Sequence, residues 1–331
     1  MSESERGGVL IGIEGGGTET HCLLVALDGT VLGEGKGGPS NILYVGVDRA
    51  SESIQKAIAE AIRMRTSQEK ALIVCVGAAG SGNPEGKRMM QEVLERIQIS
   101  HRNVIVHDGV ISLIGATAGK PGIVVIAGTG SICYGMNSSG RYARSTGWGP
   151  ILGDEGSAYD IARKGMILAL RSYDGRDEPT ALARRFVAHL GLSSIEDLVT
   201  KVYVKGMERH QIAALAPLVL DAAKEGDKAA LQLILRAGQE LGIAVIAVAR
   251  QLGVLNQEIE VAMMGGIFEN FASFIIAPFQ EKVLGSMSKV KFIRPRLRPV
   301  EGAVILAAKE LGLTVDQAFL TKLHLGIAQT R

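Results

Sequence analysis

One order of local features occurs twice in this chain, and it limits the folds that the chain can adopt. In each copy an apolar strand leads into a Gly-rich loop that contains Thr, a second strand follows, and a Gly-containing hairpin leads to a third strand. The copies span residues 9–34 and 123–145. Two unrelated hairpins would share this order, because hairpins are common. The matching loop chemistry favours an internal duplication, in which each half forms a three-stranded meander with a glycine loop at its first turn.

The second copy continues into a glycine-rich segment that we expect to lie near an anion. The apolar strand 123–127 leads into the loop 128–131, which carries no bulky side chain. Such a loop lets backbone N–H groups approach a phosphate closely. Residues 147–157 then enter an apolar helix near Ser157, whose free N–H groups would favour an anion nearby.

Strands alternate with helices between the two copies, which predicts an α/β fold. A helix is expected over 50–64, where apolar residues recur with helical spacing, and strands are expected at 70–76 and 103–106. After Ser157 the pattern is mostly helical, with strands at 258–264 and 290–293.

A break at Gly119-Lys120-Pro121-Gly122 ends the last helix before the second copy. We therefore expect an N-terminal α/β lobe over 1–118 and a larger lobe over 119–331. Each lobe would contain a mixed sheet with flanking helices, and the second would be enlarged by helices. The last helix is a candidate to pack back on the first lobe.

Composition argues against several classes of function. The 36 basic and 34 acidic residues leave a net charge of +2, without a basic run for nucleic acid or a membrane surface. The longest apolar runs are too short to span a bilayer. Cys22, Cys75 and Cys133 lie in strand-like apolar runs and are interpreted as reduced core residues, not as metal ligands. The polar N-terminus, 1–8, lacks a signal-peptide core, so the expected location is the cytoplasm.

Each candidate site residue has a structural alternative when it is considered alone. Asp108, after a strand, could be a helix N-cap, and Asp154 could cap the helix that follows it. Asn41 could be a turn residue, and Trp148, the one Trp in the chain, could serve packing. Together, two phosphate loops and a single Asp at a strand end indicate phosphoryl transfer, which needs phosphate donors, Mg²⁺ and a carboxylate that takes the acceptor proton.

The motifs also resemble a known family. Gly12-Ile13-Glu14-Gly15-Gly16-Gly17-Thr18, Asp108, Gly128-Thr129-Gly130-Ser131, Gly147-Trp148-Gly149 with Gly153-Asp154-Glu155-Gly156-Ser157, and Gly265-Gly266 are similar to those of the N-acetylglucosamine kinase branch of the sugar-kinase/actin-like ATPases. This branch is grouped with BadF/BadG/BcrA/BcrD-type ATPases. The resemblance covers about residues 9–312 and implies a two-lobed actin-like/ribonuclease H-like ATPase fold.

The resemblance also implies roles for individual residues. Asp108 would be the base on the 6-hydroxyl of an amino sugar, and Glu14, which stands where many relatives carry Asp, would hold Mg²⁺ through water. The implied ATP-binding residues are Gly16, Gly17, Thr18, Thr129, Gly130, Ala214, Gly265, Gly266 and Asn270. The implied sugar-binding residues are Asn41, Asp108, Ser131, Gly147, Trp148, Gly149 and Asp154.

Three functions remain open from the sequence. The favoured one is an ATP-dependent sugar kinase, expected from the family to be a homodimer. The second is an ATPase activator of a 2-hydroxyacyl-CoA dehydratase, which needs cysteines from two subunits to hold an iron–sulfur cluster. The third is a non-catalytic sugar or nucleotide sensor, against which Thr18, Thr129 and Asp108 argue. The identity of the sugar depends on a few pocket contacts that the sequence does not determine.

Overall fold

The computed structural model describes residues 8–63 and 70–328, so residue 64 of the expected first helix and residues 1–7 lie outside it. The chain forms two compact units, residues 1–121 with 294–331, and residues 122–293. The sequence placed the boundary after residue 118 and assigned 119–331 to the second lobe. In the structure the chain after residue 293 belongs to the first unit.

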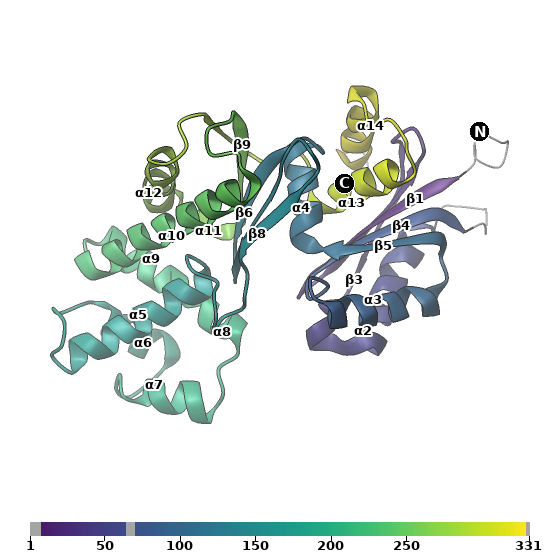
Figure 1. Cartoon of the computed structure of the whole chain (residues 1–331). Helices are drawn as coiled ribbons and strands as arrows, with labels where there is room; N and C mark the ends of the chain where they lie inside the picture. The colour runs from purple at the N-terminus through teal and green to yellow at the C-terminus, as the bar shows by residue number, and fades with distance from the viewer. Residues whose placement is uncertain (1–7, 64–69, 329–331) are drawn as a thin grey trace. The chain divides into compact units, whose positions relative to one another are not determined.

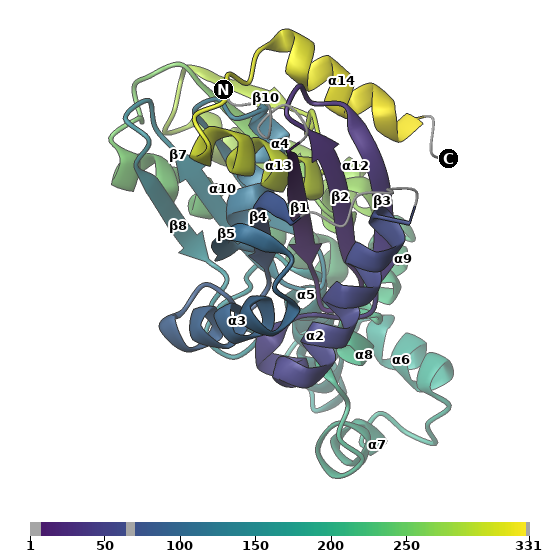
Figure 2. The same ribbon diagram turned by 90° about the vertical axis from the view of Figure 1, so that its right-hand side faces the viewer.

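The first unit is built on a five-stranded mixed sheet with the order β3-β2-β1-β4-β5 (Figures 1 and 2). Its strands are β1 (Val9–Gly15), β2 (Thr20–Ala26), β3 (Val31–Gly37), β4 (Ala71–Ala78) and β5 (Ser100–His107). Its helices are α2 (Ile42–Ala61), α3 (Pro84–Ile97), α4 (Asp108–Thr117), α13 (Pro299–Glu310) and α14 (Gln317–Ala328).

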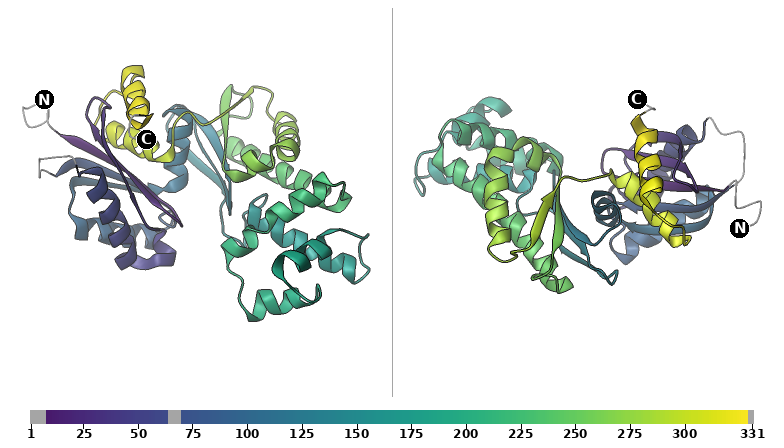
Figure 3. Two further views of the ribbon diagram at one scale, coloured as in Figure 1. Left: turned by 180° about the vertical axis from the view of Figure 1, so that it is seen from behind. Right: turned by 90° about the horizontal axis from the view of Figure 1, so that it is seen from above.

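Helices cover both faces of this sheet, which explains why its central strand is apolar from Val9 to Ile13. Alternate residues of β1 such as Ile11 and Ile13 pack with α2 and α3, and Leu10 packs with α4, α13 and α14. A central strand with both faces covered reads as a continuous apolar run. The tail beyond Leu313 contains α14, whose Phe319 and Leu323 join Leu10 in one apolar cluster. Figure 3 shows this C-terminal segment in yellow beside the strands of the first unit.

The second unit repeats the same sheet with the order β10-β9-β6-β7-β8. Its strands are β6 (Gly122–Ala127), β7 (Ser131–Met136), β8 (Tyr142–Thr146), β9 (Ile259–Met264) and β10 (Val290–Ile293). In both units the first strand pairs antiparallel with the second and parallel with a later strand. The predicted duplication of the meander is therefore confirmed in topology as well as in sequence.

Helices enlarge the second unit, as the sequence predicted. They are α5 (Ala158–Tyr173), α6 (Leu182–Leu190), α7 (Asp197–Val199), the π-helical turn η1 (Thr200–Val204), α8 (Arg209–Ala213), α9 (Ala216–Lys224), α10 (Lys228–Leu252), α11 (Gly266–Asn270) and α12 (Ala272–Leu284). The pattern over 210–225 suggested one helix, but Pro217 lies in the first turn of α9 and separates it from α8. Within the part of the chain that the structure describes, α10 alone is long and apolar enough to cross a membrane, and more than half of its apolar window is buried.

Helices α4 and α13 cross in the first unit where neither has a side chain. A Cβ on Gly302 would overlap the carbonyl oxygen of Ile111 and lie 2.6 Å from the Gly115 nitrogen. A Cβ on Gly115 would lie 2.5 Å from the Arg298 carbonyl oxygen. These two glycines let the helix backbones approach closely. Asp108 is the first residue of α4 and Arg298 is the N-cap residue of α13, so the crossing places both on one side of the sheet.

Gly302→Ala should destabilise the first unit. The added methyl group meets backbone atoms that cannot rotate away, so we expect a loss of roughly 1–3 kcal/mol in the free energy of unfolding. Gly285→Ala is the matched control, because the nearest atom to a Cβ there would be the Glu281 carbonyl oxygen at 3.4 Å, an ordinary van der Waals distance. Equal midpoints of chemical denaturation for wild type and Gly302→Ala would contradict the packing of this crossing.

Candidate functional site

The first glycine loop joins β1 to β2 and is held by a neighbouring segment of the first unit. The N–H groups of Ser40 and Asn41 both donate to the Gly16 carbonyl oxygen at 3.0 Å. The Thr20 hydroxyl lies 2.7 Å from the Ser40 hydroxyl. Gly17 and Thr18 form the exposed tip of the loop, where a Cβ on Gly17 would meet nothing within 4 Å. The loop is anchored at its base and open at its tip, as a phosphate loop requires.

Asn41 lies beside this loop with an unpaired polar atom. It precedes α2 as the N-cap residue, but its side chain makes no capping hydrogen bond. Its Oδ1 atom is buried and has no hydrogen-bond partner among the described residues, and a Cβ on Gly80 would lie 2.8 Å from it. The Ser81 hydroxyl oxygen is also buried and has no hydrogen-bond partner among the described residues. Buried acceptors are normally paired, so these atoms indicate a place for a polar ligand.

Asp108 follows β5 directly and is the first residue of α4. The N-cap is His107, whose Nδ1 accepts from the Gly109 N–H at 3.0 Å, while Asp108 Oδ1 accepts from the same N–H at 2.8 Å. His107 Nδ1 lies 2.6 Å from Asp108 Oδ1, and 36% of the Asp108 side chain is exposed. The structure thus places His107 against the candidate base.

A second carboxyl group, that of Glu14, lies in the electrostatic field of Asp108. Burial and, to a smaller extent, the Asp108 charge raise the pKa of Glu14 to about 7, against the opposing effects of Arg298 and the Val300 N–H. Arg298 is fixed by Glu34 at 2.8 Å and by Glu301 at 3.2 Å. Sequence reasoning missed Arg298, because it lies far along the chain in the segment that returns to the first unit.

The two carboxyl groups suit a divalent cation that obtains most of its ligands elsewhere. No cluster of three or more His, Cys, Asp or Glu residues that could hold a metal ion occurs within residues 8–63 and 70–328. Mg²⁺ commonly uses one or two protein carboxylates, with water and phosphate oxygens as its other ligands. Oxygen donors of this number and kind fit Mg²⁺ bound together with a phosphate compound.

The second glycine loop, residues 128–130, packs onto the start of α5. The N–H groups of Ala158 and Tyr159 donate to the carbonyl oxygens of Gly128 and Thr129 at 2.9 and 3.3 Å. Ser157 is the N-cap, and its hydroxyl accepts from the Asp160 N–H at 3.2 Å. The prediction of free N–H groups at this helix start is therefore wrong for its first three donors, because the loop and the cap already satisfy them.

An ion pair that the sequence did not predict lies next to this loop. Asp154 is 2% exposed, and its Oδ2 atom accepts from Arg209 Nη2 at 2.5 Å. Burial raises the pKa of Asp154, and the charge of Arg209 opposes this shift. The nearby Ser131 hydroxyl donates to the Glu155 carbonyl oxygen at 2.7 Å, so Ser131 and Asp154 are both bonded within the second unit.

The segment 147–153 presents apolar side chains to the solvent. Trp148 is 61% exposed, and the Arg144 guanidinium lies 3.9 Å from the centre of its ring. Gly147 and Gly149 adopt the left-handed conformation, with φ of 69° and 89°, which a side chain disfavours. Trp148 therefore offers a ring surface, as a pocket residue would, instead of filling the core.

The expected nucleotide residues at the end of β9 also gather in the second unit. Gly265 has φ of 97°, and a Cβ there would lie 2.5 Å from the Ala127 carbonyl oxygen, just before the second loop. A Cβ on Gly266 would lie 3.3 Å from Asn270 Nδ2. Ala214 ends α8 and is exposed. Gly265 thus brings the β9 end and the second loop to one edge of the sheet.

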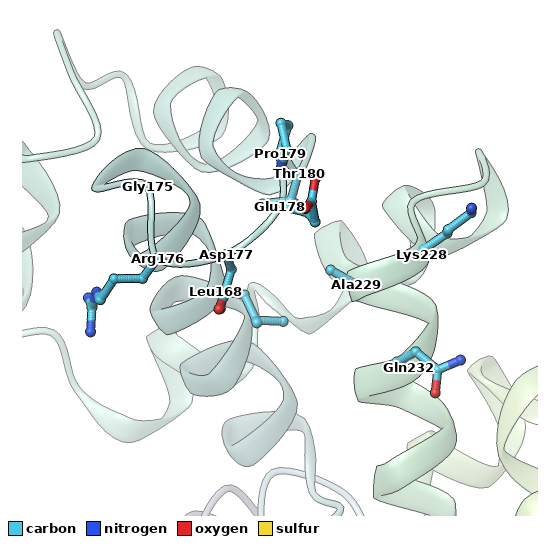
Figure 4. Close-up of a pocket in the computed structure, with 10 residues that line it drawn as sticks. All are labelled: Leu168, Gly175, Arg176, Asp177, Glu178, Pro179, Thr180, Lys228, Ala229 and Gln232. Carbon is cyan, nitrogen blue, oxygen red and sulfur yellow. The ribbon is translucent and has the colours of Figure 1, made fainter.

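A separate pocket of about 610 Å³ lies between the 175–180 segment, α5 and α10 (Figure 4). None of the site residues expected from the sequence lines it. Its Asp177 carboxylate is paired with Arg171 at 2.6 Å. The expected site residues divide between the two units: Glu14, Gly16, Gly17, Thr18, Asn41 and Asp108 belong to the first, and the others belong to the second.

Comparison with known proteins agrees with these features. A family model described as the BadF/BadG/BcrA/BcrD ATPase family matches residues 11–307. An N-acetylmuramic acid/N-acetylglucosamine kinase of Clostridium acetobutylicum is 36% identical over 302 residues, which cover 91% of this chain and 98% of the relative. An N-acetyl-D-glucosamine kinase of Dictyostelium discoideum is 29% identical and covers 90% of this chain and 97% of the relative. The crystal structure of a proposed N-acetylglucosamine kinase from Chromobacterium violaceum superposes with a TM-score of 0.74 at 27% identity, covering 91% of this chain and 99% of that one.

The raised pKa of Glu14 predicts a pH-dependent stability. The ordinary pKa of 4.5 applies in the unfolded chain and about 7 in the folded one, so the folded state binds the proton more tightly between these values. The free energy of unfolding therefore falls as the pH rises from 4.5 to 7. Glu14→Gln, which cannot ionise, should be more stable than wild type above pH 7 by up to about 3 kcal/mol.

Chemical denaturation without nucleotide or Mg²⁺ measures this difference. The gain should shrink toward zero as the pH falls below 4.5, where wild-type Glu14 is protonated in both states. Glu19→Gln changes an exposed residue and serves as the control. A difference between Glu14→Gln and wild type that does not change with pH would contradict the assignment.

Proposed function

Because the chain belongs to the BadF/BadG/BcrA/BcrD ATPase family, we propose that it is an ATP-dependent kinase that phosphorylates the 6-hydroxyl of N-acetylglucosamine or a related amino sugar. The relatives that are named as enzymes are sugar kinases, and the similarity extends over about nine tenths of this chain. The observation that carries the proposal is the position of Asp108. It lies at the end of β5, partly exposed, in the same unit as the first glycine loop.

Asp108 is proposed as the general base. Its carboxylate would accept the proton of the sugar hydroxyl as that oxygen attacks the γ-phosphate. His107 and the Gly109 N–H both contact Oδ1 and restrict its rotation. An oriented carboxylate at a strand end is what in-line transfer to an alcohol needs, because little covalent chemistry is left to the protein beyond positioning and charge.

ATP would bind through both glycine loops. Gly16, Gly17 and Thr18 would donate to phosphate oxygens from the first unit, and Thr129 and Gly130 from the second. Ala214, Gly265, Gly266 and Asn270 would contact adenosine. Mg²⁺, held by Glu14 through water, would neutralise phosphate charge. The raised pKa of Glu14 supports this role, because a cation near two carboxyl groups favours their ionised forms.

The sugar would be bound by Asn41, Ser131, Gly147, Trp148, Gly149 and Asp154. The buried, unpaired Oδ1 atom of Asn41 supports this, since a sugar N–H or hydroxyl could satisfy it. The exposed ring of Trp148 supports a contact with an apolar sugar face.

Closure of the two lobes would exclude water, which would otherwise compete as phosphate acceptor. The balanced charge supports a small-molecule substrate instead of nucleic acid or a membrane, and we propose a cytoplasmic location and, from the family resemblance, a homodimer.

The dehydratase-activator alternative is weakened by the cysteines. Cys22, Cys75 and Cys133 are the three cysteines of the chain, and each is at most 1% exposed on a strand. Ligands for a cluster shared between subunits must reach a surface. Burial also raises the pKa of all three thiols, which disfavours the thiolate that binds iron.

An assay of ADP formation with Mg²⁺ and a panel of hexoses tests the proposal. We expect ADP and a sugar 6-phosphate in equal amounts with N-acetylglucosamine or a related amino sugar, and little ADP without sugar. The panel includes N-acetylmuramic acid, glucosamine, N-acetylmannosamine and glucose. ADP formed at the same rate without any sugar would favour the ATPase alternative instead.

Asp108→Asn should reduce turnover by roughly 10²–10⁴-fold, the usual contribution of a general base, and leave ATP binding nearly unchanged. The substituted side chain keeps its size, so a folded protein is expected. Asp48→Asn, at a side chain that is 90% exposed, is the matched control. Sugar phosphorylation by Asp108→Asn at the wild-type rate would remove Asp108 from the mechanism.

A further inference from the structure

Arg209 is a partly exposed cationic partner of the buried Asp154, beside the second glycine loop, and neither the motifs nor the relatives assign it a role. It is the first residue of α8, and Nη2 donates to Asp154 Oδ2 at 2.5 Å. The Asp154 backbone has φ of 64°, a left-handed conformation that is uncommon outside glycine. Such strain is retained where the surrounding structure requires it, often at functional sites.

The guanidinium lies directly against the loop. A Cβ on Gly130 would overlap Arg209 Nη2 and lie 2.8 Å from Asp154 Oδ2. The absence of a side chain at Gly130 is therefore what allows the ion pair to reach the loop. Gly130 needs no left-handed backbone, since it is absent from the residues with positive φ, so the requirement for glycine comes from the space that Arg209 occupies.

Arg209 also retains donors that nothing uses. Its Nε atom is buried and has no hydrogen-bond partner among the described residues. About a third of the side chain, 33%, is exposed, whereas the Asp154 side chain is 3% exposed. A guanidinium has five N–H donors in a planar fork that matches phosphate geometry. The Nη2 group of this fork is bonded to Asp154 beside Gly130, and the Nε–H donor of the same fork is left unpaired.

We propose that Arg209 binds a phosphate group of the nucleotide at the second loop and that Asp154 holds it there until the nucleotide arrives. The proposal rests on the proposed function, which assigns Thr129 and Gly130 to phosphate and Asp154 to sugar. A di- or triphosphate carries more negative charge than one carboxylate and can accept two N–H bonds from the fork. Arg209 then exchanges Asp154 for phosphate.

This exchange links the two ligands. When Arg209 turns to phosphate, the Asp154 carboxylate is left buried without its cation, which is costly. A sugar hydroxyl that donates to this carboxylate restores a partner. Nucleotide binding therefore improves sugar binding, and by linkage the sugar improves nucleotide binding by the same factor.

Binding of adenosine, ADP and a non-hydrolysable ATP analogue to the full chain, measured by calorimetry with Mg²⁺, tests the phosphate contact. Arg209→Gln should weaken ADP or ATP-analogue binding by about 10–100-fold, the usual strength of a charge-assisted bond, and leave adenosine binding unchanged. Arg209→Lys should restore part of the loss, because the charge remains without the fork. Arg236→Gln, which breaks an exposed pair with Glu240, is the control.

A purely structural ion pair would give a different result. Arg209→Gln would then lower the unfolding temperature and weaken adenosine and ADP equally, which would overturn the proposal. Arg209→Gln alone leaves the buried Asp154 carboxylate without a cation, and this could unfold the protein. The double variant Arg209→Gln with Asp154→Asn removes that charge as well, so it is a second test in a protein that is expected to fold. It should keep the loss that is specific to phosphate, and wild-type affinity for ADP in this variant would also overturn the proposal.

The linkage is measured as the affinity for N-acetylglucosamine with and without ADP. Wild type should bind the sugar more tightly with ADP, and Arg209→Gln should lose this gain, whereas a retained gain would contradict the exchange.

The measurements also distinguish a failure of the proposed kinase function from a failure of the Arg209 proposal. If wild type phosphorylates no sugar but still binds ADP through Arg209, the kinase assignment fails and the phosphate contact stands. If wild type is a sugar kinase and Arg209→Gln binds ADP normally, the Arg209 proposal alone fails.

Discussion

The structure depends on one arrangement, in which parallel strands end at the same edge of a sheet whose faces are covered by helices. In the first unit β1, β4 and β5 run parallel, so Glu14, the turn at Gly80 and Asp108 are brought to a common edge. The same order of strands recurs in the second unit, where β6 and β9 end at the second loop and at Gly265. Covered apolar strands fix the edge rigidly, and short loops there can carry polar groups with little freedom to move.

Glycines set how closely the parts approach. Gly115 and Gly302 let α4 cross α13, and Gly130 leaves room for a guanidinium beside the second loop. These positions tolerate no side chain because backbone or charged atoms occupy the space where a Cβ would lie. Each unit also holds one buried carboxyl group next to a charged residue, namely Glu14 near Asp108 in one unit and Asp154 with Arg209 in the other. Buried ions contribute little to net stability, so their presence is better explained by ligand binding.

Sequence reasoning succeeded where local chemistry decides the outcome and failed where distant residues meet. The strands of both meanders, the helix that begins near Ser157 and the position of Asp108 after a strand follow from periodicity and turn residues. Helices α11 and α12 and the break at Pro217 were not predicted, because their apolar patterns are weak or continuous with their neighbours. Arg209 and Arg298 were also missed, since an arginine in a polar stretch carries no signal of its partner.

The sequence by itself determined that this is an α/β protein with a duplicated strand–loop–strand unit, since strand periodicity and glycine turns are local properties of the chain. It also determined which residue types stand at the loops. Only the tertiary structure decided which charges meet: that Arg298, from the C-terminal segment, opposes the rise in the pKa of Glu14, and that Arg209 covers Gly130 and pairs with Asp154. Electrostatic interactions act through space between residues far apart in the chain, and their strength depends on burial, which exists only once the core has formed.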